Sequence, residues 1–95
     1  MGDLAVLEKL ENAASLYLLL KSDPDANSHK LGRHLSTLPG VEEVYMTVGE
    51  WSFIIKLSSK NLERKSKLCM KRLRSLQQIK EVKKLVGAKK YSKRG

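Results

Sequence analysis

This chain has little of the chemistry that marks secreted, membrane-spanning or disulfide-bonded proteins. It contains a single cysteine, Cys69, so no disulfide can form within the chain. No apolar run approaches the roughly 20 residues that cross a bilayer. The first residues have no basic stretch followed by an apolar one, so they are not a secretory signal. One thiol suits a reducing compartment, and we expect a cytoplasmic protein without a membrane partner.

Motifs for catalysis and metal binding are also missing from the sequence. His29 and His34 stand five apart, which is not the i, i+4 pair that places two ligands on one helix face. Cys69 has no CxxC partner and is expected at a helix position facing or flanking the core. No glycine-rich phosphate loop occurs, and Ser, Asp and His do not group. We therefore predict a protein that is not an enzyme and uses no metal or cofactor.

The charge of the chain is large and unevenly distributed. The net charge is +9, yet residues 1–55 carry four basic against eight acidic groups, a balance of −4. Residues 56–95 carry fifteen basic groups against Glu63 and Glu81, a balance of +13. Such asymmetry indicates an anionic partner or complementary docking between copies of the chain. The alternative is a lysine-rich solvated surface, common in proteins of heat-loving organisms.

Residues 38–57 predict a helix end followed by a β-hairpin. Pro39-Gly40 ends the helix, because proline cannot continue it and glycine accepts the left-handed backbone past a helix end. Apolar residues alternate over residues 41–48, which predicts a strand with one buried face. Gly49-Glu50 fits a two-residue turn, and the alternation over residues 51–57 predicts the partner strand.

A strand and a helix are expected before this hairpin. The nearly continuous apolar run at residues 15–21 predicts a central strand covered on both faces. Asp25 or Asn27 can cap the first helix by accepting backbone N–H bonds. The apolar face of that helix carries Leu31, Leu35 and Leu38.

A second helix and a last strand are expected after the hairpin. Ser58-Ser59 can cap a helix over residues 60–77, and a strand follows at residues 79–86. The apolar positions of this helix are Leu62, Cys69, Leu73 and Leu76. With right-handed crossovers, the order predicts a ferredoxin-like α+β fold, βαββαβ, with a four-stranded antiparallel sheet and two helices on one face.

The domain is expected to span residues 15–87, flanked by an N-terminal arm or short helix at 1–14 and a basic flexible tail at 88–95. The sheet face without helices would be too apolar to stay in water. Packing against a second copy solves this, so we predict at least a dimer. The expected interface residues are Tyr17, Leu19, Tyr45, Phe53 and Leu85.

The run from Leu16 to Val86 resembles the effector-binding, or RAM, domain of the Lrp/AsnC transcription regulators. That family has a helix ending in leucine-proline-glycine-valine, then acidic residues and an aromatic. The chain reads Leu38-Pro39-Gly40-Val41-Glu42-Glu43-Val44-Tyr45. The family then has a threonine-glycine step, an acid, an aromatic, an aspartate and an apolar strand. The chain reads Val48-Gly49-Glu50-Trp51-Ser52-Phe53-Ile54-Ile55-Lys56.

The resemblance implies a homodimer formed through the sheets, a possible ring of dimers, and an amino-acid effector bound between dimers near the hairpin turn. Carried over, the ligand-binding residues are Gly49, Glu50, Trp51 and Ser52. Gly49 would let a charged ligand end meet backbone N–H groups, Glu50 could hold an ammonium, and Trp51 could supply a cation–π wall. The alternative is that Gly49 is only a turn residue and Trp51 only core or interface.

Two departures from the family pattern shape the expected function. Ser52 stands where the family usually has aspartate, which weakens the case for a standard amino-acid ligand. The roughly fourteen residues before the first strand cannot hold the family's helix-turn-helix, since each helix needs about 8 residues. We therefore expect an accessory module of transcription regulation that binds an effector and joins full-length Lrp/AsnC regulators.

Two other functions remain open at this point. One is a ligand-free assembly domain, which Ser52 favours. The other is a nucleic-acid-binding protein of ferredoxin-like fold, binding the backbone in a salt-dependent manner. Against it, Gly49-Glu50-Trp51 puts an acid where RNA-binding versions of this fold have a base. The candidate contacts are Lys60, Arg64, Lys67, Lys71, Arg74, Lys89 and Lys90.

Overall fold

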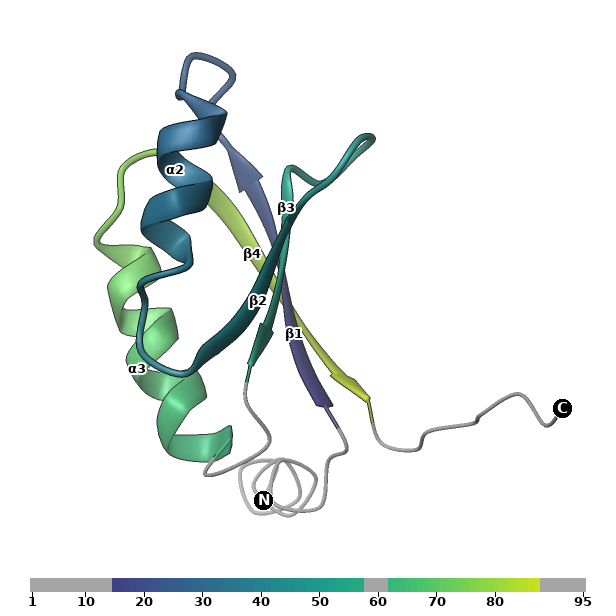
Figure 1. Ribbon diagram of the computed structural model, residues 1–95, viewed down its shortest axis with the longest axis vertical. Coiled ribbons are helices and arrows are strands. Elements are labelled where there is room, and N and C mark those ends of the chain that lie inside the picture. Colours follow the sequence, from purple (N-terminus) through teal and green to yellow (C-terminus); the bar gives the residue numbers. More distant parts are fainter. Residues whose placement is uncertain (1–14, 58–61, 88–95) are drawn as a thin grey trace, which may run out of the picture.

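The computed structural model describes residues 15–57 and 62–87, and the predicted arm, the Ser58-Ser59 cap and the tail lie outside these ranges. The elements follow in the order β1 (Ser15–Ser22), α2 (Ser28–Leu35), β2 (Val41–Met46), β3 (Phe53–Leu57), α3 (Leu62–Arg74) and β4 (Ile79–Gly87). The strands form one antiparallel sheet in the order β2-β3-β1-β4 (Figure 1). This confirms the predicted ferredoxin-like fold.

Alternation along the two central strands creates the core. Leu16, Leu18 and Leu20 of β1 are fully buried, and the residues between them are only half-buried. On β3, Phe53, Ile55 and Leu57 are buried in the same way. Because successive strand residues point to opposite faces, these six side chains share the face that the helices cover. The helix layer adds Leu31, Leu35, Leu38, Cys69 and Leu73 to the core. The prediction that β1 is covered on both faces was wrong within this chain.

The helix α2 begins where expected and ends earlier than expected. Asn27 is its N-cap, and the Asn27 Oδ1 accepts a hydrogen bond from the Lys30 backbone N–H at 3.0 Å. The helix ends at Leu35, so Leu38 is buried from the connecting turn and not from the helix. Gly40 has φ +79°, and a Cβ there would lie 2.8 Å from the Lys65 side chain. Glycine is therefore required both for the turn and for the close approach to α3.

The second helix, α3, is also shorter than predicted at its C-terminal end, since it stops at Arg74. Cys69 and Leu73 are buried in the core, and Leu76 is half-buried beyond the helix. The side chain of Leu62 lies outside the described set. No helix in the described ranges is long and apolar enough to cross a membrane.

The hairpin between β2 and β3 differs from the prediction of a two-residue turn. The Thr47 backbone N–H donates to the Ser52 carbonyl at 2.9 Å, which closes a four-residue loop at residues 48–51. The Thr47 Oγ1 also donates to the Trp51 carbonyl at 2.6 Å, and Gly49 adopts φ +123°. These side-chain and backbone bonds hold the wider loop, so Trp51 belongs to the loop and not to the strand.

A bulge also alters the predicted alternation of β2. The pairing of β2 with β3 shifts register between Val41 and Glu43. As a result, Val41 and Val44, which are three apart, both pack partly against the core. Met46 at the end of this edge strand is half exposed. Strict period-2 alternation therefore describes β1 and β3 but not β2.

The register of the sheet also corrects one predicted interface residue. Phe53 is only 1% exposed and lies in the core, on the face that the helices cover. A Cβ on Gly32 of α2 would lie 3.3 Å from the Phe53 ring, so this glycine lets the helix approach the aromatic side chain. The neighbouring Ile54 occupies the opposite face instead. The face of Phe53 is set by the pairing of β3 with β1, because Phe53, Ile55 and Leu57 lie opposite the buried Leu20, Leu18 and Leu16.

Adjacent leucines on β1 provide a test of this arrangement. Leu18→Ala should lower the free energy of unfolding by about 2–5 kcal/mol, because Leu18 is fully buried and leaves a cavity. Leu19→Ala, the matched control on the opposite face, should cost less than half as much. Urea denaturation at a protein concentration low enough to keep the chain monomeric measures both values. Equal losses would contradict the assignment of the two faces.

Candidate functional site

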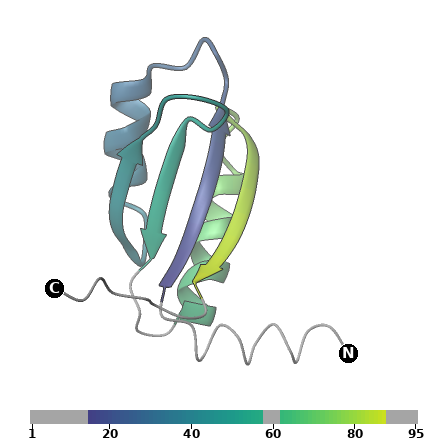
Figure 2. The ribbon, with the colours of Figure 1, turned by 90° about the vertical axis from the view of Figure 1, so that its right-hand side faces the viewer.

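The sheet face that carries no helix is lined by large side chains. We call it the open face and define it by Tyr17, Leu19, Tyr45, Ile54 and Leu85. The register sets Tyr17 opposite Leu85, and Leu19 and Tyr45 opposite Ile54. Figure 2 shows the four strands side by side, with α3 behind them. Tyr17, Leu19, Tyr45 and Leu85 thus lie where the sequence analysis expected them, and Ile54 replaces Phe53.

A lysine at the end of the open face meets the hairpin loop. The Lys21 Nζ lies 3.3 Å from the Glu50 Oε1 and 3.3 Å from the Glu81 Oε2. The same Nζ lies 4.9 Å from the centroid of the Trp51 ring, within the range of a cation–π interaction. One ammonium group is therefore held by two carboxylates and an indole. We call these four residues the Lys21 cluster.

The carboxylates of this cluster change the protonation of the lysine. Hydrogen bonds to Glu50 and then to Glu81 raise the pKa of Lys21 above its ordinary value of 10.5. The folded-state pKa lies above the unfolded one, so the pairing contributes to stability below pH 10.5. That contribution is lost as the pH rises through the folded-state pKa. Lys21 therefore carries its full charge at neutral pH.

Ser52 anchors the loop to the central strand. The Ser52 backbone N–H donates to the Leu20 carbonyl at 2.7 Å, and the Ser52 Oγ accepts from the Ser22 backbone N–H at 3.0 Å. The hydroxyl is thus engaged in positioning the loop beside β1. Of the four predicted ligand-binding residues, Ser52 therefore makes the hydrogen bonds that hold the loop in place. Gly49, Glu50 and Trp51 form the part that reaches solvent.

The sequence analysis missed two members of the cluster, Lys21 and Glu81. Both lie on strands, and the pairing of β1 with β4 sets them opposite each other. Alternation along β1 places Lys21 on the open face with Tyr17 and Leu19, which was a usable signal. Its contact with Glu50 was not readable, because it depends on the wide loop folding back over the end of β1.

Within residues 15–57 and 62–87, the remaining reactive side chains form no site. Burial raises the pKa of the Cys69 thiol to about 11, which makes it a poor nucleophile at neutral pH. His29 and His34 are exposed on α2. Among the residues that the structure describes, no three His, Cys, Asp or Glu side chains gather as metal ligands.

The predicted basic contacts are only partly described. Arg64, Lys67, Lys71 and Arg74 lie exposed along α3, and Lys60, Lys89 and Lys90 lie outside the described residues. A hollow between α3 and β4 is lined by three of the α3 residues, by Met70 and by Lys84 of β4. Lys84 reaches this hollow from the sheet, at a position that the strand register sets.

Comparison with known proteins identifies the domain. The sequence model of one protein family, the Lrp/AsnC ligand binding domain, matches residues 15–95. An uncharacterized HTH-type transcriptional regulator of Pyrococcus furiosus is 27% identical over 74 residues, covering 76% of this chain and 49% of that protein. A similar regulator of Pyrococcus horikoshii is 26% identical over the same length. The chain therefore spans about half the length of the curated relatives it matches.

Solved structures show the same fold at low sequence identity. Escherichia coli AsnC superposes with a TM-score of 0.70 at 16% identity, covering 93% of this chain and 59% of that one. A protein of Thermus thermophilus superposes with a TM-score of 0.70 at 20% identity, covering 83% of this chain and 98% of that one. At such identities the likeness shows the fold alone.

The Lys21 cluster predicts a measurable titration. In Glu50→Gln the pKa of Lys21 should fall toward 10.5, because the strongest hydrogen bond to a charged acceptor is lost. NMR of the lysine side chain over alkaline pH measures the midpoint. Glu42→Gln, which removes a carboxylate paired with Lys56, should leave that midpoint unchanged. An unaltered midpoint in Glu50→Gln would contradict the geometry of the cluster.

Proposed function

The chain belongs to the Lrp/AsnC ligand-binding domain family, and from this premise we propose that it binds a small effector, an amino acid, at an interface between copies of the domain. This is a family of transcription-regulator domains and not of enzymes. Domains of this family typically oligomerise. The effector, the interface and the partners are the parts that we propose.

The observation that supports an amino-acid ligand is the Lys21 cluster. Glu50 and Trp51 already hold one ammonium group, that of Lys21. A zwitterionic amino acid could open this ion pair, with its ammonium on Glu50 and its carboxylate on Lys21. An ion pair exposed to water contributes little to stability, so opening it costs little. Each charged end of the amino acid would then meet an opposite charge of the protein.

The exposure of the loop indicates that a neighbouring copy completes the site. The Val48 side chain is fully exposed although it is apolar, and the Glu50 side chain is 72% exposed. A Cβ on Gly49 would meet nothing within 4 Å, so its backbone is open to a ligand. A ligand held only by this loop would remain largely in water. A second domain packed against the loop would enclose it and cover Val48.

The open face is the surface that we propose for the homodimer. Its centre holds Tyr17, Leu19 and Ile54, all half-buried, beside the more exposed Tyr45 and Leu85. Lys56 on β3, opposite Tyr17 and Glu43, and Lys83 on β4, opposite Leu19, add charged side chains to this face. Aromatic and apolar side chains beside polar ones are the composition of a protein interface.

Co-assembly with longer regulators is the role that we propose for such a module. The curated relatives are HTH-type transcriptional regulators, and this chain matches about half of each. A shared sheet face would let this domain pair with the corresponding domain of such a regulator. Effector binding would then shift the mixed assembly by mass action.

A ligand-free assembly domain is the second candidate. Ser52 supports it, because its hydroxyl is already engaged with the Ser22 backbone N–H. Lys21 supports it as well, because its ammonium satisfies both Glu50 and Glu81 without a ligand. The two candidates share the open face and differ only in the role of the loop.

Two leucines of nearly equal exposure test the proposed dimer. Leu85 on the open face is 41% exposed, and Leu68 on α3 is 43% exposed. Leu85→Glu should weaken self-association at least tenfold, because it places a charge in an apolar interface. Leu68→Glu should leave it unchanged. Sedimentation equilibrium over a concentration series measures both, and equal effects would contradict the proposed interface.

Thermal unfolding with each of the twenty amino acids tests the effector. A ligand that binds only the folded assembly stabilises it by about 2.7 kcal/mol when its concentration is 100-fold above Kd, so Tm must rise. Glu50→Gln should abolish the shift, and Glu42→Gln, which alters another exposed Lys–Glu pair, should keep it. No shift with any amino acid would favour the ligand-free assembly domain.

A further inference from the structure

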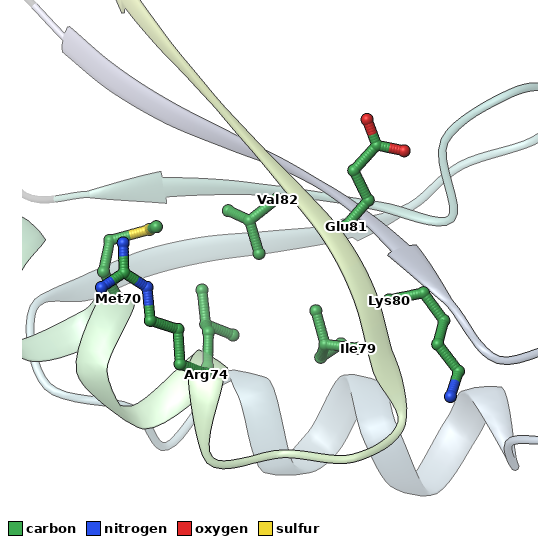
Figure 3. A pocket seen from close by; sticks show the side chains of 7 residues that line it. Met70, Arg74, Ile79, Lys80, Glu81 and Val82 are labelled. Atoms are coloured by element: carbon green, nitrogen blue, oxygen red, sulfur yellow. The ribbon is translucent and has the colours of Figure 1, made fainter.

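The cleft between α3 and the edge strand β4 contains two adjoining hollows. One, of about 330 Å³, is lined by Met70, Leu73, Arg74 and the first four residues of β4. The other, of about 450 Å³, is lined by Lys67, Met70, Lys71, Arg74 and Lys84. Met70 and Arg74 line both, so the hollows form one continuous groove. Figure 3 shows Met70 and Arg74 on the α3 side, with Ile79 and Val82 facing them from β4.

The larger hollow is cationic because of where the sheet register places Lys84. Lys84 pairs with Leu18, a core residue, and therefore lies on the face that the helices cover. On an edge strand this position opens to solvent beside α3, so the lysine stem can lie along the groove while its charge stays in water. Lys71 and Arg74 face it from the helix. Four of the five residues that line this hollow are basic.

Acidic residues are scarce around this groove. Residues 62–87 contain nine Lys and Arg against two acids, Glu63 and Glu81, a balance of +7. Glu81 is paired with Lys21 on the open face, and Figure 3 places it beyond the β4 ribbon from Arg74. The positive charge is concentrated in the larger hollow, which no acidic residue lines, whereas the smaller hollow combines Arg74 and Lys80 with Glu81.

Some basic residues of the groove already interact with other groups of the protein. Lys80 of β4, in the smaller hollow, lies 3.5 Å from Asp23 and is held there. Lys67 also has an interaction of its own. Within the described ranges, Lys71, Arg74 and Lys84 form no ion pair with a carboxylate. These three residues are the ones whose charge is available to a ligand.

We propose that this groove binds the phosphate backbone of duplex nucleic acid. Lys71 and Arg74 lie three residues apart along α3, about 4.5 Å at 1.5 Å per residue, and Lys84 lines the same hollow from β4. Three available cationic side chains exceed what one phosphate needs and suit a polymer with regularly repeated charges. Lys84 provides the opposite wall, so phosphates would lie between the helix and the strand.

The side chains of the groove favour a duplex over a single strand or an acidic peptide. Single-stranded binding relies on stacking against aromatics, and no aromatic lines either hollow. Peptide binding relies on buried apolar anchors. The large apolar side chains that the described residues expose are Tyr45, Met46, Val48, Leu68 and Leu85, and none of them lines the groove.

The cationic hollow of the groove is separate from the proposed effector site, and only the smaller hollow shares a residue with it, Glu81. The groove lies on the helix side of the sheet, and the open face lies on the other side. A dimer formed through the open face would therefore leave the groove of each copy accessible. The contacts are to the backbone, so binding should be independent of sequence.

Fluorescence anisotropy with a labelled mixed-sequence duplex DNA tests this proposal on the full chain. Between about 50 and 200 mM salt, log K should fall with log salt at a slope of about −3 or steeper, as three to four phosphate contacts require. Arg74→Gln/Lys84→Gln should weaken binding about tenfold and flatten the slope by about 2. Lys84→Gln alone changes an exposed residue and should flatten the slope by about 1.

Lys30→Gln/Arg33→Gln is the matched control. It removes one lysine and one arginine that are also exposed, from α2 and away from the groove. It should change affinity less than threefold, with Tm measured for every variant. The proposal is overturned if the wild type does not bind at low salt, or if both pairs weaken binding equally. Tighter binding of single-stranded DNA, or equal binding of poly-glutamate with the same loss in the groove variants, would also overturn it.

Discussion

The structure depends on the alternation of the strand β1. Its even-numbered leucines, Leu16, Leu18 and Leu20, are completely buried, and they belong to one core cluster with side chains of β3 and both helices. β1 lies between β3 and β4, so its position determines the register of the whole sheet. A slip of one residue would place these leucines in water and Tyr17 and Leu19 in the core. The loss of three buried leucines makes that alternative strongly unfavourable.

The same alternation positions both candidate surfaces. On the odd-numbered side, Tyr17 and Leu19 lead to Lys21, which meets Glu50 and Trp51 of the loop and Glu81 of β4. On the even-numbered side, the register sets Lys84 opposite Leu18 and beside α3. The open face and the Lys21 cluster therefore lie on one side of the sheet, and the cationic groove lies on the other side.

The hairpin loop differs from the family pattern at one of the residues that the resemblance assigns to ligand binding. Ser52 replaces the carboxylate expected by resemblance, and its hydroxyl is engaged in joining the loop to β1. Lys21 then supplies a charge that pairs with Glu50. The cluster sets one ammonium between two carboxylates, a net charge of −1, so the effector that we propose needs a cationic group beside its anion. This constraint favours zwitterions over simple anions.

By itself the sequence determined the order of the elements, the alternation of β3 and the membership of the family, and it narrowed the cap of α2 to Asp25 or Asn27. Each of these rests on local periodicity or on residues close together in the chain. Tertiary structure decided the bulge in β2, the four-residue loop, the face of the sheet on which Phe53 lies, and the meeting of Lys21 with Glu50, 29 residues away. It also decided that Lys84 faces α3. These depend on strand register and loop closure, which bring together residues whose relation is not encoded in any local pattern.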